Sequence, residues 1–223
     1  MPKVAVILSG CGYLDGSEVQ EAVLTLLELD KAGCQVQCFA PDIQQENVVS
    51  HLDGQPSTFR ERNVLEESAR IARGDIVPLA DAKEGDFDAV ILPGGQGVIK
   101  NLCNFAFEGP KCAVDGEVER FIFDMYKVGK PIGAICLAPA LVVRILGAED
   151  IQVNVTMGRD KKMAQAIRDC GGVHTDCNAD EIIIDAKHKV VSTPAYMYDA
   201  TTIGKVSTGV AKLVKTVLGM VKK

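Results

Sequence analysis

The chain has 223 residues, of which 47% are hydrophobic and 24% charged, and its formal net charge is −6. This is the composition of a globular protein, and the acidic excess argues against a surface for nucleic acids or anionic membranes. Because one hydrophobic core grows to roughly 250–300 residues before it divides, we expect a single domain over residues 1–223.

The first two patterns predict a strand and a helix. Residues 4–10 (VAVILSG) form an apolar run typical of a buried strand. Ser17 then opens an S-x-x-Q capping box, and we expect the helix that follows to end at Gly33. The predicted apolar face of this helix consists of Val19, Ala22, Val23, Leu26 and Leu27.

Strand and helix patterns alternate along the rest of the chain. A helix after each apolar strand predicts an α/β fold with a mostly parallel sheet that is covered on both faces. The exception is a late β-hairpin at 182–193, and residues 42–60 are expected to be irregular. The other expected strands are 35–40, 87–95 and 131–135, and the other expected helices are 63–73, 117–129, 137–146 and about 198–221.

The segment KPIGAICLAPALVVRIL, residues 130–146, places a cysteine between a strand and a helix. Proline is tolerated in the first turn of a helix, so Pro139 puts Cys136 roughly at the N-cap. Ligands of parallel sheets bind at the carboxyl ends of the strands. The helix N-terminus favours the thiolate, so we expect the pKa of Cys136 to lie below its usual ~8.5. The alternative is a small buried cysteine at a tight turn.

Backbone N–H groups near Cys136 have the arrangement of a nucleophile elbow. Leu137 offers its N–H to a developing oxyanion, and Gly94 and Gly95 let the backbone approach the same point without a Cβ. The PGGQG loop lacks both G-x-G-x-x-G and the P-loop lysine, which argues against a nucleotide site. Cys11 also follows a strand at this edge and is the second choice for a reactive thiol.

The remaining cysteines and the histidines predict neither disulfides nor a metal site. Eight cysteines lie at positions 11, 34, 38, 103, 112, 136, 170 and 177, with no C-x-x-C pair, and the three histidines are scattered. A chain of this size needs no disulfides, so we expect free thiols and no bound metal.

The N-terminus, MPKVAVILSG, leads directly into a strand pattern without a basic segment and cleavage site. No apolar run reaches the ~18 residues of a membrane span. We therefore expect a cytoplasmic protein, although a mature mitochondrial form that has lost its presequence would look the same.

Several segments together resemble one known family. They are LSGCGYLDGSEVQEAV, FAPD, RNVLEESARIARG, ILPGGQGVIKNLCNFA, GKPIGAICLAPA and VVSTPAYM. In order and spacing they are similar to the ElbB-like branch of the superfamily that holds class I glutamine amidotransferases, PfpI-type peptidases and Parkinsonism-associated deglycase relatives. The branch is named for isoprenoid biosynthesis, and its bacterial member is described as a glyoxalase. The resemblance implies a flavodoxin-like three-layer sandwich, a homodimer and no cofactor.

The resemblance also assigns roles to two residues. Cys136 falls on the nucleophile, and Glu21 falls on the carboxylate that approaches it from the first helix. A carboxyl held beside a thiol in a partly apolar pocket should have a raised pKa and could move a substrate proton. Glu18 shares a helical face with Glu21, but we interpret it as a partner of the helix dipole.

The chain departs from the better-known enzymes of the superfamily. Leu137 stands where PfpI-type peptidases have histidine, and STPAYMYD lacks the H-x-E of amidotransferases. NVTMGRD, at 154–160, lacks the histidine of deglycases, and His174 is interpreted as a structural histidine. Glutaminase and peptidase activities are therefore not expected.

The predicted site combines a thiol, a carboxylic acid and oxyanion donors but has no histidine. Such a site can act on a small electrophilic aldehyde, which reacts with a thiolate without an activated leaving group. We expect glyoxal or a related 2-oxoaldehyde to form a hemithioacetal on Cys136, with Glu21 moving the proton that yields the hydroxy acid. The alternative is a non-catalytic protein whose reactive cysteine senses oxidants or whose pocket binds a metabolite. The sequence does not separate these two functions.

Overall fold

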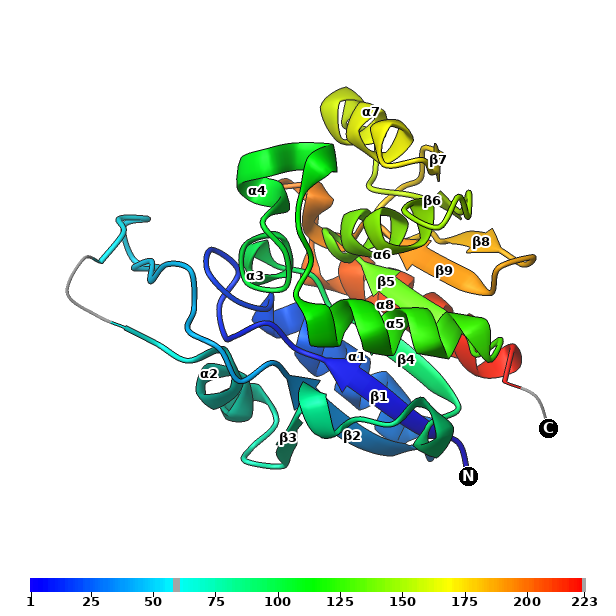
Figure 1. Cartoon of the computed structure of the whole chain (residues 1–223), viewed down its shortest axis with the longest axis horizontal. Coiled ribbons are helices and arrows are strands. Elements are labelled where there is room, and N and C mark those ends of the chain that lie inside the picture. Colours follow the sequence, from blue (N-terminus) through cyan, green and yellow to red (C-terminus); the bar gives the residue numbers. More distant parts are fainter. Residues whose placement is uncertain (58–60, 222–223) are drawn as a thin grey trace.

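A seven-stranded sheet forms the centre of the computed structural model, which describes residues 1–57 and 61–221 (Figure 1). The strand order is β3-β2-β1-β4-β5-β9-β8, and every neighbouring pair is parallel except β8 and β9. The strands are β1 (Lys3–Ile7), β2 (Gln35–Ala40), β3 (Ile76–Pro78), β4 (Ala89–Leu92), β5 (Ile132–Ile135), β8 (Ile183–Asp185) and β9 (Val190–Thr193). The predicted mostly parallel sheet and the late hairpin are confirmed.

Helices cover both faces of the sheet and complete a three-layer sandwich. Helices α1 and α8 pack side by side on one face, and α5 and α6 lie together on the other (Figure 1). The helices are α1 (Val19–Lys31), α2 (Val64–Ile71), α3 (Gln96–Lys100), α4 (Phe105–Glu108), α5 (Gly116–Lys127), α6 (Ala138–Gly147), α7 (Lys161–Asp169) and α8 (Ile203–Gly219). Short 3₁₀ turns lie at Leu79–Asp81, Glu84–Asp86, Gly109–Lys111 and Ala195–Met197. The flavodoxin-like sandwich that the resemblance implied is therefore confirmed.

A second, small sheet follows α6 and was not predicted. It pairs β6 (Asn154–Val155) with β7 (Val173–His174) in parallel, with α7 between them. Strands this short carry too little periodicity to be recognised in a sequence.

The predicted start of α1 is wrong by one residue, and its predicted apolar face is right only at Ala22 and Leu26, which pack on the core. Glu18, rather than Ser17, is the N-cap, because its carboxylate accepts the Glu21 N–H at 2.6 Å, while the Ser17 hydroxyl accepts the Ser9 N–H at 2.8 Å. The buried residues of the helix are Glu21, Ala22, Thr25 and Leu29, whereas Val19, Val23 and Leu27 are exposed. Two polar side chains occupy the core face because each has a hydrogen-bond partner there, which periodicity alone does not reveal.

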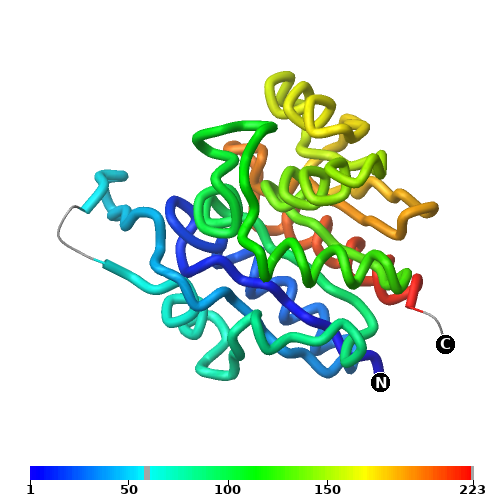
Figure 2. Tube along the Cα trace, viewed as in Figure 1, coloured from blue at the N-terminus to red at the C-terminus, as the bar shows by residue number. Residues whose placement is uncertain are grey.

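The other boundaries differ in smaller ways. The last helix begins at Ile203 instead of about residue 198, because the chain first forms the 3₁₀ turn after Pro194 and Thr202 supplies the N-cap. Residues 42–57 form neither helix nor strand, as predicted, and project beyond α2 (Figure 2); the rest of the predicted irregular stretch, 58–60, lies outside the described residues.

The carboxyl ends of the central strands meet at one edge of the sheet. Strands β1, β4, β5 and β9 are almost completely buried and run parallel, so the loops that follow them lie next to one another. Two of these loops, 93–95 and 136–137, contain residues predicted for the site, and the 8–18 connection leads into α1, which carries Glu21.

Candidate functional site

Cys136 lies at a sharp turn between β5 and α6. Its φ of 60° is in the left-handed region, which a residue with a Cβ adopts at a cost of about 1–3 kcal/mol. Leu137 is the N-cap of α6 and Pro139 lies in the first turn, so the N-cap lies one residue after Cys136, where it was predicted. The Cys136 N–H donates to the carbonyl of Thr193 at 2.9 Å, which ties the turn to β9. The predicted elbow between strand and helix is confirmed.

Glu21 reaches Cys136 from the first helix and is completely buried. One carboxyl oxygen accepts the Gly94 N–H at 2.9 Å, and the other accepts the Tyr196 N–H at 3.2 Å. The thiol of Cys136 lies close enough to this carboxyl group for each to shift the pKa of the other. Two loops therefore fix the orientation of one carboxyl group.

The two glycines of the PGG loop allow the close approach of these groups. A Cβ at Gly94 would overlap the Cβ of Cys136 and lie 2.7 Å from Oε2 of Glu21. Gly95 has a φ of 102°, and a Cβ there would overlap the carbonyl oxygen of Gly16. The N–H groups of Gly95 and Leu137 lie close enough to Cys136 to lower the pKa of its thiol. The structure thus brings together all five residues predicted for the site.

The expected low pKa of Cys136 is wrong. Burial raises the pKa of the Cys136 thiol well above its usual value, and the neighbouring Glu21 carboxylate raises it further. The N–H groups of Gly95 and Leu137 lower the pKa but do not outweigh these effects. Burial and the nearby Glu18 carboxylate likewise raise the pKa of Glu21 to about 8, in the predicted direction. At neutral pH both groups hold their protons.

A cavity of about 310 Å³ opens beside Cys136. Besides Gly95, Cys136 and Leu137, the residues that line it are Tyr13, Glu18, Gln96, Tyr196, Met197 and Asp199. Of these, only Glu18 was considered as a candidate from the sequence. The missed residues lie in the connections after β1, β4 and β9, so the rule that ligands bind at the carboxyl ends of strands could have found them.

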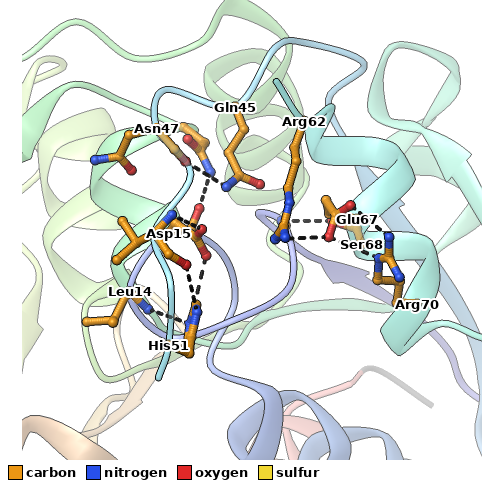
Figure 3. A network of polar contacts seen from close by, with 12 residues as sticks. Leu14, Asp15, Gln45, Asn47, His51, Arg62, Glu67, Ser68 and Arg70 are labelled. Atoms are coloured by element: carbon orange, nitrogen blue, oxygen red, sulfur yellow. Dashed lines mark hydrogen bonds and ion pairs between the residues drawn. The ribbon is translucent and has the colours of Figure 1, made fainter. Parts of the chain in front are cut away.

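A network of polar contacts around Asp15 and His51 lies next to this cavity wall (Figure 3), because His51 contacts Tyr13. The Asp15 carboxylate is completely buried and accepts the Val49 N–H at 2.7 Å. Nε2 of His51 accepts the Leu14 N–H at 3.2 Å and lies 3.8 Å from the same carboxylate. The ring of Tyr13 packs edge-on against His51, with 5.3 Å between the ring centroids. The network therefore anchors residues 42–57 to the loop that carries one wall of the cavity.

The two secondary candidates lie apart from the cavity lining. Cys11 is partly buried, and burial together with the nearby Glu67 carboxylate raises its pKa. His174 is buried, and its Nε2 accepts the Met157 N–H at 3.0 Å. Burial lowers the pKa of His174, so it is a neutral residue that supports the turn after β6, as the structural interpretation predicted.

Residues 1–57 and 61–221 contain neither a metal-binding group of side chains nor a membrane-spanning helix. No group of three or more His, Cys, Asp or Glu side chains is arranged to hold a metal ion there. Within the same residues, no helix is both long and apolar enough to cross a membrane.

The sequence and the fold have clear relatives. The DJ-1/PfpI family matches residues 3–189. A human protein, glutamine amidotransferase-like class 1 domain-containing protein 3, mitochondrial, is 42% identical over 99% of this chain and 84% of its own length. The crystal structure of an isoprenoid biosynthesis protein with an amidotransferase-like domain from Ehrlichia chaffeensis has a TM-score of 0.93 and 36% identity, with both chains fully covered.

A more distant structure shares the fold. Glyoxalase III from Candida albicans has a TM-score of 0.63 and covers 99% of this chain and 98% of its own, but at 14% identity the likeness shows the fold alone. The relatives confirm the resemblance to the ElbB-like branch. The name of the human relative places that protein in mitochondria, so the expected cytoplasmic location finds no support there.

Proposed function

The chain belongs to the DJ-1/PfpI family, and on that basis we propose that it is a cofactor-independent glyoxalase-like enzyme acting on glyoxal or a related small 2-oxoaldehyde. The observation that carries the proposal is the buried pair of Cys136 and Glu21 beside a cavity. Cys136 is the nucleophile, Glu21 moves the protons, and the N–H groups of Gly95 and Leu137 stabilise the developing oxyanion.

The first step forms a hemithioacetal. The Glu21 carboxylate accepts the thiol proton of Cys136, and the sulfur attacks one aldehyde carbon of glyoxal. A carbon–sulfur bond forms as the carbonyl π bond breaks, and Glu21 passes the thiol proton to the oxygen, which leaves Glu21 a carboxylate again. The N–H groups of Gly95 and Leu137, which lie near the sulfur, would donate to that oxygen as its charge develops.

The second step moves a proton between the two carbons. Glu21 removes the proton from the carbon that bears sulfur, which gives an enediolate, and returns it to the neighbouring carbon while the hydroxyl proton passes from the first oxygen to the second. The first carbon is thereby oxidised to a thioester and the second is reduced to an alcohol, so no external oxidant or reductant takes part. Water then cleaves the thioester, releasing glycolate and restoring the Cys136 thiol.

The raised pKa of Glu21 suits this role. A general base works best when its pKa lies near the operating pH, and burial brings that of Glu21 to about 8. Its two backbone hydrogen bonds hold the carboxyl group in place without neutralising it. One carboxyl group can then act as base and acid in turn, so no histidine is needed.

The same features favour the enzyme over a redox sensor. Oxidation of a cysteine follows thiolate character and exposure. Cys136 is only 6% exposed, and burial raises its pKa. A substrate that enters the cavity reaches this thiol beside its base, whereas an oxidant in solution meets a buried, protonated sulfur.

The proposal is tested by following glyoxal conversion with NMR. Wild type should produce glycolate, and Cys136→Ser should produce none above the rate without protein. Cys11→Ser is the matched control and should retain full activity, because Cys11 does not line the cavity. Equal glycolate production by wild type and Cys136→Ser would contradict the proposed function.

We also propose a homodimer, formed through the exposed stripe of α1. Val19, Val23 and Leu27 are 38%, 48% and 42% exposed and recur on one side of the helix. Burying such a stripe against a second copy would remove apolar surface from water. Light scattering should give a dimer mass for wild type and a monomer mass for Val23→Glu. Val128→Glu, at a similarly exposed valine that is the C-cap of α5, should remain dimeric.

A mitochondrial location is proposed from the name of the human relative. Subcellular fractionation of cells that express the protein from its own gene should find it with mitochondrial markers. Recovery in the cytosolic fraction alone would contradict this location.

A further inference from the structure

The cavity beside Cys136 is larger than glyoxal requires. Its volume of about 310 Å³ holds roughly ten groups of the size of a water molecule, at ~30 Å³ each. A second cavity of about 420 Å³ shares four of its lining residues: Tyr13, Glu18, Tyr196 and Asp199. These four side chains line the first cavity together with Cys136, so a substrate longer than glyoxal has room to extend from the thiol toward them.

The shared walls carry negative charge. Glu18 and Asp199 line both cavities, and in the described part of the chain no lysine, arginine or histidine lines either one. Asp199 is exposed and forms no ion pair with any residue among 1–57 and 61–221. Its charge is therefore available to a ligand. An anionic substrate would meet like charges here and leave its own charge without a partner.

Two tyrosines complete the shared walls. Tyr13 is held by its edge-on contact with His51, and the Tyr196 hydroxyl donates to the side chain of Gln20. The Tyr196 backbone N–H binds Glu21, so this residue is fixed at both ends. Aromatic rings beside carboxylates are the usual surroundings of a bound organic cation, because the ring faces attract positive charge.

We propose that the natural substrate of Cys136 is a carbonyl compound with an ammonium or guanidinium group several bonds from its reactive carbon, which Glu18, Asp199, Tyr13 and Tyr196 select. The inference rests on the proposed function, because it takes Cys136 as the nucleophile. Glu18 and Asp199 are then specificity residues that contact the cationic end, while Glu21 remains with the reacting carbons. Glyoxal is a minimal substrate that fills only the end of the cavity next to the thiol.

The proposal is tested by labelling Cys136 with reagents of opposite charge. One is a methanethiosulfonate with a trimethylammonium group, and the other is the same reagent with a sulfonate group. Each labelling rate at Cys136 is measured by peptide mapping and divided by the rate with a free thiol in solution. The cationic reagent should be favoured by roughly tenfold or more, because two carboxylates near the path act with opposite sign on the two reagents. High salt should reduce this preference.

Charge-neutralising variants identify the residues responsible. Asp199→Asn and Glu18→Gln should each lower the preference at least about threefold. Gln at position 18 keeps an oxygen that can accept the Glu21 N–H. Glu149→Gln is the matched control, because Glu149 is exposed beyond the far end of α6, and it should leave the preference unchanged. Equal labelling by both reagents, or a preference for the sulfonate, would overturn the proposal.

A second measurement separates this proposal from the proposed function. Choline and its neutral isostere, with a tert-butyl group in place of trimethylammonium, are compared as protectants of Cys136 against the neutral reagent iodoacetamide. If choline protects Cys136 and its neutral isostere does not, a cation site is supported, even if the protein does not convert glyoxal. Glycolate production without any preference for choline would overturn the cationic substrate and leave the glyoxalase proposal intact.

Discussion

Two cysteines follow central strands at the same edge of the sheet, but their surroundings differ. Cys136 is joined directly to α6 through the Leu137 N-cap, in a left-handed backbone conformation. Cys11 is separated from α1 by a loop that runs to Glu18, so no helix N-terminus begins at it. The neighbours of Cys136 are a buried carboxyl and two N–H groups, whereas those of Cys11 include ion-paired Glu67. Both cysteines lie at the edge of the sheet where ligands bind, so this position does not distinguish them. What distinguishes Cys136 as the candidate nucleophile is the short connection between its strand and the helix that follows.

Among the changes that test this comparison, removal of the carboxyl group beside Cys136 should have the largest effect on turnover. Glu21→Gln should lower glycolate production about 10²- to 10⁴-fold, the usual effect of removing a positioned acid or base. Glu67→Gln, at the carboxylate beside Cys11, should leave turnover unchanged. Steady-state kinetics with glyoxal measures both, and circular dichroism checks the fold. Turnover within tenfold of wild type in Glu21→Gln would assign proton transfer to another group.

Stability should depend on pH through Glu21. Burial raises its pKa from 4.5 to about 8 in the folded protein. The folded state thus binds this proton more tightly than the unfolded state, and the stabilisation is complete below about pH 4.5 and is lost as pH rises through about 8. Over this window the wild type should lose on the order of 4 kcal/mol of unfolding free energy from this group.

Urea unfolding at about pH 5 and about pH 9 measures this loss. Glu21→Gln should lose much less stability over the same window, because its side chain does not ionise. Glu67→Gln is the control and should keep the full loss. An equal loss in wild type and Glu21→Gln would show that another group is responsible.

The close packing at Cys136 should not tolerate a Cβ on Gly94. Gly94→Ala should destabilise the protein by about 1–3 kcal/mol, because the added methyl group overlaps Cys136 and presses on Glu21. Gly116→Ala, at the start of α5, has open space around the new Cβ and should be neutral or slightly stabilising. Thermal unfolding of the two variants compares them directly, and equal melting temperatures would contradict the observed packing.

The smallest expected effect concerns Ala195, a second left-handed residue beside the site. Its φ of 45° turns the chain after β9, and the next residue, Tyr196, donates its N–H to Glu21. Ala195→Gly should relieve local strain, but the entropy cost of glycine and the loss of a completely buried methyl group offset that gain, leaving stability within about 0.5 kcal/mol of wild type. Chemical unfolding can resolve such a change. A loss of more than about 1 kcal/mol would show that the turn is not strained.

The sequence predicted the sheet and the elbow because both depend on local signals. Apolar runs identify buried parallel strands, and Pro139 fixes the start of α6 within one residue. The face of α1 could not be predicted in this way, because Glu21 and Thr25 are buried through hydrogen bonds rather than hydrophobicity. Glu21 itself came from the family resemblance and not from the helical pattern.

The remaining parts of the site depend on contacts between distant segments. The Tyr196 N–H bonds to Glu21 across 175 positions of the chain, and nothing in the sequence around either residue indicates this contact. The pKa of Cys136 was predicted in the wrong direction for a related reason. The helix N-terminus is visible in the sequence, but burial and the nearby Glu21 carboxylate, which outweigh it, follow only from the fold.

The pH dependence of glycolate production tests the central claim most directly, because the mechanism requires Glu21 as a carboxylate. The kcat/KM of wild type for glyoxal should rise from about pH 6, reach half its maximum near pH 8 and level off above about pH 9, as the buried Glu21 loses its proton. A kcat/KM that stays constant over this range, or falls, would contradict the assignment of Glu21 as the base that serves Cys136.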